Sequence, residues 1–307
     1  MKHCLLRRLL GLVPLLLGIS FLSFVLIQLS PGDPAEVVIR VNDMTPTPEL
    51  LAEVRTQLGL DRPFPERYLR WLADVLRGDL GMSYVNGRPV AGELARALPP
   101  TLMLAGTAAA IMLVCSLAVA LVCVRHEGRV VDRLLRALLF LGTSVPAFWA
   151  GLLLIWLFSV HLDWLPTGGL EGPSSLVLPA LPYLAAYARL LRNSMVQTAQ
   201  EDFVLYARAC GRSRGAILCM VLRNSLQASL TALGMSLPKL VAGSFVVECI
   251  FAWPGLGRLC VTAIFNRDLP VIQAYVLLMA VLFVAGNLCM DICAGLLDPR
   301  LRERGLR

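Results

Sequence analysis

Gln197–Ser225 reads QTAQEDFVLYARACGRSRGAILCMVLRNS, a polar, arginine-rich stretch set between apolar segments. Its charged side chains are Glu201, Asp202, Arg208, Arg212, Arg214 and Arg223. Because ionised side chains are costly in hydrocarbon, we expect this stretch to lie at an aqueous surface. The pattern predicts a helix from Glu201 to Cys210, a break at Gly211 and a second helix from Ser213, a helical elbow. Small side chains at Ala207 and Ala209 would keep one face of it thin enough for another protein's surface to approach.

The rest of the chain favours an all-α polytopic membrane protein. Of its 307 residues, 57% are hydrophobic and only 16% are charged, which is too apolar for an ordinary soluble domain of this size. A membrane-spanning helix needs about 20 mainly apolar residues. Six stretches approach or exceed that length: Leu9 to Leu29, Thr101 to Val124, Leu134 to Val160, Leu176 to Leu191, Leu226 to Ile250, and Ile272 to Leu297.

These spans predict four regions. Residues 1–29 hold a cytoplasmic N-terminus and the first transmembrane helix, and residues 30–100 form an external insertion. Residues 101–297 form the transmembrane core with helices 2–6 and the cytoplasmic loop 197–225, and residues 298–307 are a cytoplasmic tail.

Two amphipathic helices are expected in the external insertion. Thr47 can cap a helix that begins at Pro48 and stops at Gly59, and a second helix runs from about Pro63 to Arg77.

The distribution of basic residues predicts the orientation. Lysine and arginine gather before the first span, between the second and third, between the fourth and fifth, and after the last. By the positive-inside rule both termini are therefore cytoplasmic. Trp156, Trp164 and Trp253 fall near expected outer boundaries and are interpreted as interface anchors. The net charge of +7 is spread over these loop ends, which argues against a nucleic-acid surface.

Two charged residues are expected inside the bilayer, Lys239 near the middle of the fifth span and Glu248 near its outer end. Such residues should face the bundle interior, water or a partner, so both are candidates to line a translocation path. An internal ion pair or snorkelling toward the interface is the alternative interpretation. The fifth span is therefore the first place to look for a path.

Catalytic and cofactor motifs are missing from the sequence. It contains no G-x-x-x-x-G-K-[ST] loop for ATP phosphates, and its cysteines show neither C-x-x-C pairs nor histidines at ligand spacing. We therefore expect no catalytic residue, no metal site and no cofactor. Two other classes stay open at this stage, an ion-coupled secondary transporter and a purely structural or assembly subunit.

Several motifs resemble one family over nearly the whole length. They are RRLLGLVPLLLGISFLSFVLIQLSPGDPA from Arg7, LGLDRPFPERYLRWLADVLRGDLGMS from Leu58, SVPAFWAGLLLIWLFSV from Ser144, DFVLYARACG from Asp202, VVECIFAWPGLGRL from Val246 and LLDPRLR from Leu296. Together, in this order, the chain resembles the inner-membrane permease subunits of dipeptide, oligopeptide and nickel ABC importers.

The resemblance implies partners and a role for the elbow. It implies a pore shared with a homologous second permease in the bacterial inner membrane, two ATP-hydrolysing subunits, and an extracytoplasmic binding protein that delivers substrate. The elbow would be the coupling helix that docks on an ATPase subunit, and the permease itself would not be an enzyme. The coupling residues would be Glu201, Asp202, Tyr206, Ala207, Arg208, Ala209, Gly211, Arg223 and Asn224. The sequence departs from the usual pattern at Leu205, where a broader consensus has Glu, and at Cys210, where Lys is common.

The substrate has two candidates. The stretches TPTPELLAEVRTQLGLDRPF from Thr45 and VTAIFNRDLPVIQ from Val261 look more like nickel and metal-chelate permeases than general peptide permeases. Nickel or a related transition metal, carried by a small chelator, is therefore favoured. Import of di- or oligopeptides is the alternative.

Overall fold

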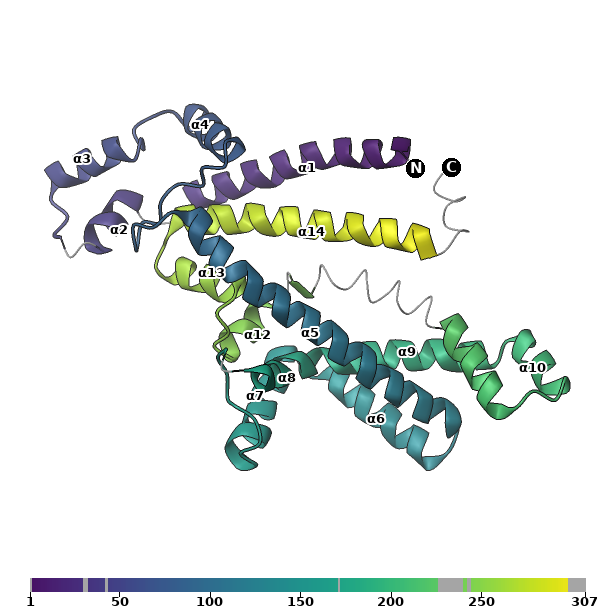
Figure 1. The fold of residues 1–307 in the computed structure, drawn as a ribbon. Coiled ribbons are helices and arrows are strands. Elements are labelled where there is room, and N and C mark those ends of the chain that lie inside the picture. Colours follow the sequence, from purple (N-terminus) through teal and green to yellow (C-terminus); the bar gives the residue numbers. More distant parts are fainter. Residues whose placement is uncertain are drawn as a thin grey trace. The chain divides into compact units, whose positions relative to one another are not determined.

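The computed structural model describes residues 2–29, 33–41, 44–170, 172–225, 240–241 and 244–297 (Figure 1). Every regular element in these residues is helical; the extended contacts are limited to an isolated bridge between Met82 and Pro89. The chain divides into two compact units. The first comprises residues 1–100 and 255–284, and the second comprises residues 101–254 and 285–307.

The first unit begins with α1 (Lys2–Gln28), α2 (Pro34–Val41), α3 (Pro48–Gln57) and α4 (Phe64–Leu76). Thr47 caps α3 as predicted, since its hydroxyl oxygen accepts the Leu50 N–H at 3.3 Å. Gly59 follows α3 with φ +65°, a left-handed conformation that glycine adopts without strain. Both helices predicted in the insertion are therefore confirmed.

Aromatic rings join α4 to α1. Phe24 of α1 packs edge-on against Phe64 at 5.4 Å and Tyr68 at 5.5 Å between ring centroids. The Tyr68 hydroxyl also lies 2.9 Å from the Ser20 hydroxyl. Aromatic pairs of this geometry add roughly 0.5–1.5 kcal/mol beyond the area that they bury. Successive turns of α4 present these rings, so one face of the helix is held against α1.

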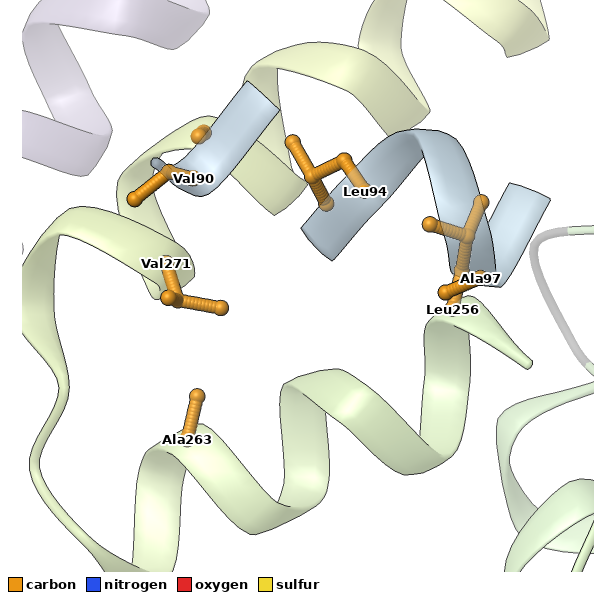
Figure 2. Close-up of a cluster of buried hydrophobic side chains, with 7 residues drawn as sticks. Val90, Leu94, Ala97, Leu256, Ala263 and Val271 are labelled. Atoms are coloured by element: carbon orange, nitrogen blue, oxygen red, sulfur yellow. The ribbon is translucent and has the colours of Figure 1, made fainter. Parts of the chain in front are cut away.

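A second cluster joins α5 (Val90–Arg125) to α13 (Leu256–Phe265) and the start of α14 (Leu269–Leu297). Figure 2 shows Val90, Leu94 and Ala97 of α5 facing Leu256, Ala263 and Val271. The α5 residues recur at the spacing of one helix face. Their burial explains why α5 starts at Val90, before Thr101, where the second membrane span was predicted to begin. Packing offsets the backbone hydrogen bonds that Pro99 and Pro100 forfeit inside the helix.

Asp268, between α13 and α14, anchors the loop that leads into α5. Its carboxylate is almost fully buried and accepts hydrogen bonds from the Ser83 hydroxyl and from the Tyr84 N–H, the latter at 3.0 Å. The Ser83 hydroxyl oxygen in turn accepts the N–H groups of Val85 and Asn86, each at 3.2 Å. The buried carboxylate therefore orders a turn that has little regular structure of its own.

The second unit contains a broken span. α6 (Val130–Ser144) and α7 (Ala147–Leu154), which continues as a π-helix over Ile155–His161, meet at an angle of 112°. The residue before a proline avoids the helical region, and Val145 accordingly has ψ 130°. The angle is sharper than the single uninterrupted span predicted from Leu134 to Val160 would allow.

Within the described residues, three helical segments are long and apolar enough to cross a membrane: Val90–Arg125, Ser174–Ala199 and Leu269–Cys289. The bent α6–α7 pair would make a fourth. Most of the fifth predicted span lies outside the described residues, so a total of six stays a prediction.

The second unit buries one acidic and one aromatic side chain completely, Glu248 and Trp253. Glu248 of α12 (Phe245–Ile250) is 0% exposed and accepts hydrogen bonds from Thr101 Oγ1 at 2.7 Å and Ser244 Oγ at 3.0 Å. Trp253 is also 0% exposed and packs against Leu104 and Leu176. The interpretation of Trp253 as an interface anchor is therefore wrong, because an anchor must present its ring to the interface. Trp156 and Trp164 are exposed.

A buried ion pair fixes α9 (Leu184–Ala199) against α6. Arg192 Nη2 of α9 lies 2.9 Å and 3.1 Å from the two carboxylate oxygens of Asp132 in the first turn of α6. The Asp132 side chain is only 2% exposed and also accepts the Gly128 N–H at 3.2 Å. An acid in the first turn further complements the helix dipole.

Arg192→Met should destabilise the protein by about 3–5 kcal/mol, because it leaves the Asp132 carboxylate buried with its main counter-charge removed. Denaturant unfolding of the purified protein in detergent measures the change. Arg136→Gln is the matched control, since Arg136 is half-exposed and lies 3.5 Å from the same carboxylate. Its cost should stay within roughly 1 kcal/mol. Equal effects of the two substitutions would contradict the importance given to the buried pair.

Candidate functional site

The helical elbow predicted from the sequence is present. α10 (Asp202–Ala209) follows α9 after a tight turn, as Figure 1 shows, and residues 214–225 form the next helix. Glu201 has an extended backbone, and its carbonyl accepts the Val204 N–H at 2.9 Å, the first turn of α10. The predicted helix from Glu201 to Cys210 is confirmed with one residue fewer at each end.

Gly211 ends α10 through a double hydrogen-bonded cap. Its φ is +69°, and its N–H donates to the Arg208 carbonyl at 3.0 Å while the Arg212 N–H donates to the Ala207 carbonyl at 3.1 Å. This pair of bonds is the Schellman motif, which requires a left-handed residue at this place. The predicted break at Gly211 is thus a defined turn that sets the angle at which the chain leaves α10.

The second helix of the elbow has its own start signal. The Ser213 hydroxyl oxygen accepts the Ala216 N–H at 3.3 Å, and the Ser213 carbonyl accepts the Ile217 N–H at 3.0 Å. At the other end, the Ser194 hydroxyl donates to the Ser225 carbonyl at 3.5 Å, which links this helix to α9. The elbow therefore begins at the end of α9, and its second helix is hydrogen-bonded back to α9.

One side of α10 is buried in the second unit. Val204 is 1% exposed and Ala207 is 5% exposed, and their spacing of three places them on one face. Val204 belongs to an apolar cluster with Ala120 of α5, Leu191 and Met195 of α9, and Val221. Displacing α10 alone would expose this cluster, so the short helix is held by its neighbours.

The other side of α10 is an exposed surface made by Leu205, Tyr206, Arg208 and Ala209, called here the elbow face. Leu205 is 67% exposed and Tyr206 is 73% exposed. The expectation that Ala207 lies on the open face is wrong, because the helical period turns it toward Val204. Leu205 was not among the predicted site residues. Its position on the helix, beside Tyr206 and opposite Val204 and Ala207, was the sequence signal that could have identified Leu205 as exposed.

The remaining predicted coupling residues surround the elbow face. Glu201 and Asp202 are exposed at the start of α10, while Arg223 and Asn224 are exposed on the following helix. The Asn224 amide donates to the Met220 carbonyl at 2.9 Å. Acids near the start of α10 and Arg208 in its last turn both complement the helix dipole.

The turn between α5 and α6 supports the base of the elbow, which the sequence did not suggest. Gln200 Nε2 donates to Glu127 Oε1 at 3.1 Å, just before α10 begins. Gly128 in the same turn donates its N–H to Asp132, the partner of Arg192. The elbow base is therefore connected to the buried ion pair.

Of the two predicted translocation-path residues, the structure describes one. Glu248 is buried in the second unit with Thr101 and Ser244, and Lys239 lies outside the described residues. Across the part of the chain that the structure describes, no three histidine, cysteine or acidic side chains gather as metal ligands. The elbow itself offers apolar contact and charge.

Gly211→Val should loosen the elbow, because a β-branched residue is strained at φ +69° by about 1–3 kcal/mol. Trypsin cleavage after Arg212 or Arg214 should become faster in the folded protein. Gly211→Asn is the matched control, since asparagine tolerates this conformation. Unchanged cleavage in the valine variant would show that the cap does not hold the elbow.

Comparison with known proteins agrees with this architecture. A family described as "Binding-protein-dependent transport system inner membrane component" matches residues 112–303, and the corresponding N-terminal family matches residues 1–105. The chain is 40% identical to the metal-staphylopine import system permease protein CntB of Staphylococcus aureus, with 97% of each chain covered. It is also 40% identical to the glutathione transport system permease protein GsiC of Salmonella paratyphi A, covering 99% of this chain and 100% of the relative.

A solved structure shares the fold. The MetNI methionine ABC transporter in inward-facing conformations matches with a TM-score of 0.58 and 18% identity, covering 67% of this chain and 96% of that chain. The chain therefore belongs to the binding-protein-dependent transport system inner membrane components and is a multi-pass permease of an ABC importer.

Proposed function

We propose that this permease forms half of a translocation pore with a homologous second permease and is driven by two ATP-hydrolysing subunits. An extracytoplasmic binding protein delivers the substrate, and both termini lie in the cytoplasm. Family membership supports this assembly. The observation that carries the coupling role is the elbow face, where Leu205 and Tyr206 stand exposed on a helix whose other side is buried.

An exposed leucine beside an exposed tyrosine suits docking on another protein. Such residues bury large apolar area on contact, and a tyrosine can also place its hydroxyl on a partner. Glu201, Asp202, Arg208, Arg223 and Asn224 would supply a polar rim. Ala207 and Gly211 would act from inside the elbow, one by packing and the other by setting the turn.

The support beneath α10 suggests how motion passes from the ATPase to the pore. A push on the elbow face reaches α5 and α9 through the apolar cluster around Val204. The Ser194–Ser225 hydrogen bond and the Asp132–Arg192 pair resist independent movement of the parts. We therefore propose that the elbow moves with these helices as a lever between inward- and outward-facing states. The permease makes and breaks no covalent bond.

Glu248 and Lys239 remain the proposed path residues. The Glu248 carboxylate accepts hydrogen bonds from the Thr101 and Ser244 hydroxyls, and these bonds fix the orientation of its side chain. A role in the path requires the pore helices to expose it during transport. Such exposure would belong to one state of the transport cycle only.

For the substrate we propose nickel or another transition metal, imported as a complex with a small chelator. The likeness to a metal-staphylopine permease over almost the full length supports this reading. The equal identity to a glutathione permease keeps peptide import as the second candidate. The stretch from Thr45 and the stretch from Val261 favour the metal.

Leu205→Ala combined with Tyr206→Ala should weaken docking of the ATPase subunits and lower uptake by roughly tenfold or more, as expected for losing two exposed anchors. Co-purification of the ATPase and transport into cells measure the effect. Leu76→Ala is the control, because Leu76 on α4 is 80% exposed and belongs to the first unit. Normal ATPase binding and uptake in the double variant would refute the coupling assignment.

Cells lacking this gene should lose uptake of radiolabelled nickel supplied with chelator while retaining uptake of a labelled dipeptide. Each measurement is made with and without the chelator, and the gene is restored on a plasmid. Loss of dipeptide uptake with intact nickel uptake would keep the ABC importer and replace the metal by peptides.

A further inference from the structure

The first unit contains an open cleft of about 790 Å³ that none of the coupling residues explains. Its walls come from α4, the turn after α3, the end of α1 and the start of α14. Small-molecule sites in proteins commonly enclose about 300–1,000 Å³. The cleft therefore has the size of a site for a small solute.

Positive charge dominates the lining. Arg55, Arg62, Arg67 and Arg70 line the cleft against two acids, Asp33 and Asp74. On α4 the lining residues Arg67, Arg70, Trp71 and Asp74 recur at spacings of three and four, so one face of the helix forms the wall. The adjoining face carries Phe64 and Tyr68, whose rings hold α4 against α1. A fixed helix thus presents arginines beside an aromatic ring.

The arginines differ in how far their charge is already matched. Arg55 lies 2.6 Å from Asp33, and Arg62 and Arg70 share Glu66 at 3.2 Å and 3.0 Å. Arg67 is half-buried and forms no ion pair within the described ranges. Because Arg is matched bidentately by carboxylates, Arg67 is the group with most to gain from an anion.

Tyr84 adds a hydrogen-bond donor beside Arg67. Burial raises the pKa of Tyr84, an effect that the positive charge of Arg67 reduces and the negative charge of Asp268 reinforces. A tyrosine hydroxyl is protonated at neutral pH even at its ordinary pKa of about 10, so Tyr84 can donate a hydrogen bond there. The Tyr84 backbone is held by its hydrogen bond to Asp268, so the ring has a fixed base. Side-chain amides of Gln28, Gln57 and Gln273 complete the polar lining.

We propose that this cleft is a binding site for a small organic anion that carries carboxylate groups, held by Arg67 and Arg70 beside Trp71. The inference rests on the proposed function, because a metal chelate that presents carboxylate oxygens at its surface belongs to this class. The guanidinium groups would pair with carboxylates, and Trp71 would cover the organic framework. The site would then select the chelated cargo over the bare cation, which the excess of arginines over acids in the lining repels.

The phosphate of a lipid headgroup offers the same anionic chemistry, so the test must separate the two sources. The permease is purified with its partner subunits and placed in nanodiscs of neutral phosphatidylcholine, without binding protein or ATP. The probe is radiolabelled nickel complexed with EDTA, a small carboxylate-rich dianion. Free nickel ion and phosphatidylglycerol nanodiscs are the comparison arms.

We expect saturable binding of nickel–EDTA to the unchanged protein in neutral nanodiscs. Arg67→Gln should weaken that binding about tenfold or more, because it removes a charge-assisted contact. Arg77→Gln is the matched control, since Arg77 lies at the end of α4, is 77% exposed and does not line the cleft. It should bind the probe as the unchanged protein does. Free nickel ion should not compete.

Three results would overturn the proposal. The first is the absence of saturable probe binding, and the second is an equal loss of probe binding in the Arg67 and Arg77 variants. The third is displacement of the probe by phosphatidylglycerol at fixed ionic strength, which would mark a lipid site. Uptake measured on the same variants separates this inference from the proposed function. Chelate-dependent nickel uptake that persists without cleft binding would refute the cleft alone. Loss of nickel uptake in the Leu205/Tyr206 variant with intact cleft binding supports both.

Discussion

The contact between Asp132 and Arg192 is the constraint on which the second unit depends most. Both groups leave water when α6 and α9 pack, and each is tolerable there because the other is present. The carboxylate also accepts a backbone N–H of the preceding turn, and that turn contacts Gln200 at the base of the elbow. One buried pair therefore links two helices, a loop and the start of α10.

The elbow combines a rigid support with an exposed contact surface. Its turn is set by a glycine in the left-handed region, and its inner face is packed by Val204 and Ala207. The same helical period that buries those two residues turns Leu205 and Tyr206 outward. Under the proposed drive by partner subunits, such a surface would receive a force and pass it to the packed helices without deforming first.

In the first unit, too, buried contacts fix a helix so that one of its faces stays open. Aromatic rings hold α4 against α1, and a buried Asp268 orders the loop before α5. These contacts leave the arginine-bearing face of α4 open on a cleft. A segment that the sequence described only as an amphipathic insertion thus has one face for packing and another for charge.

The sequence by itself determined the class of protein, the caps and stops of the insertion helices, and the elbow with its break at Gly211. These features depend on local rules: apolar length, capping side chains and glycine's access to positive φ. It could not place Trp253 or the start of α5, because both depend on distant apolar partners that offset a local preference. Nor could it tell that Ala207 faces inward, that Leu205 faces outward, or that Asp132 meets Arg192 across 60 residues of chain. Only tertiary packing decided these, because burial and ion pairing depend on which helices meet.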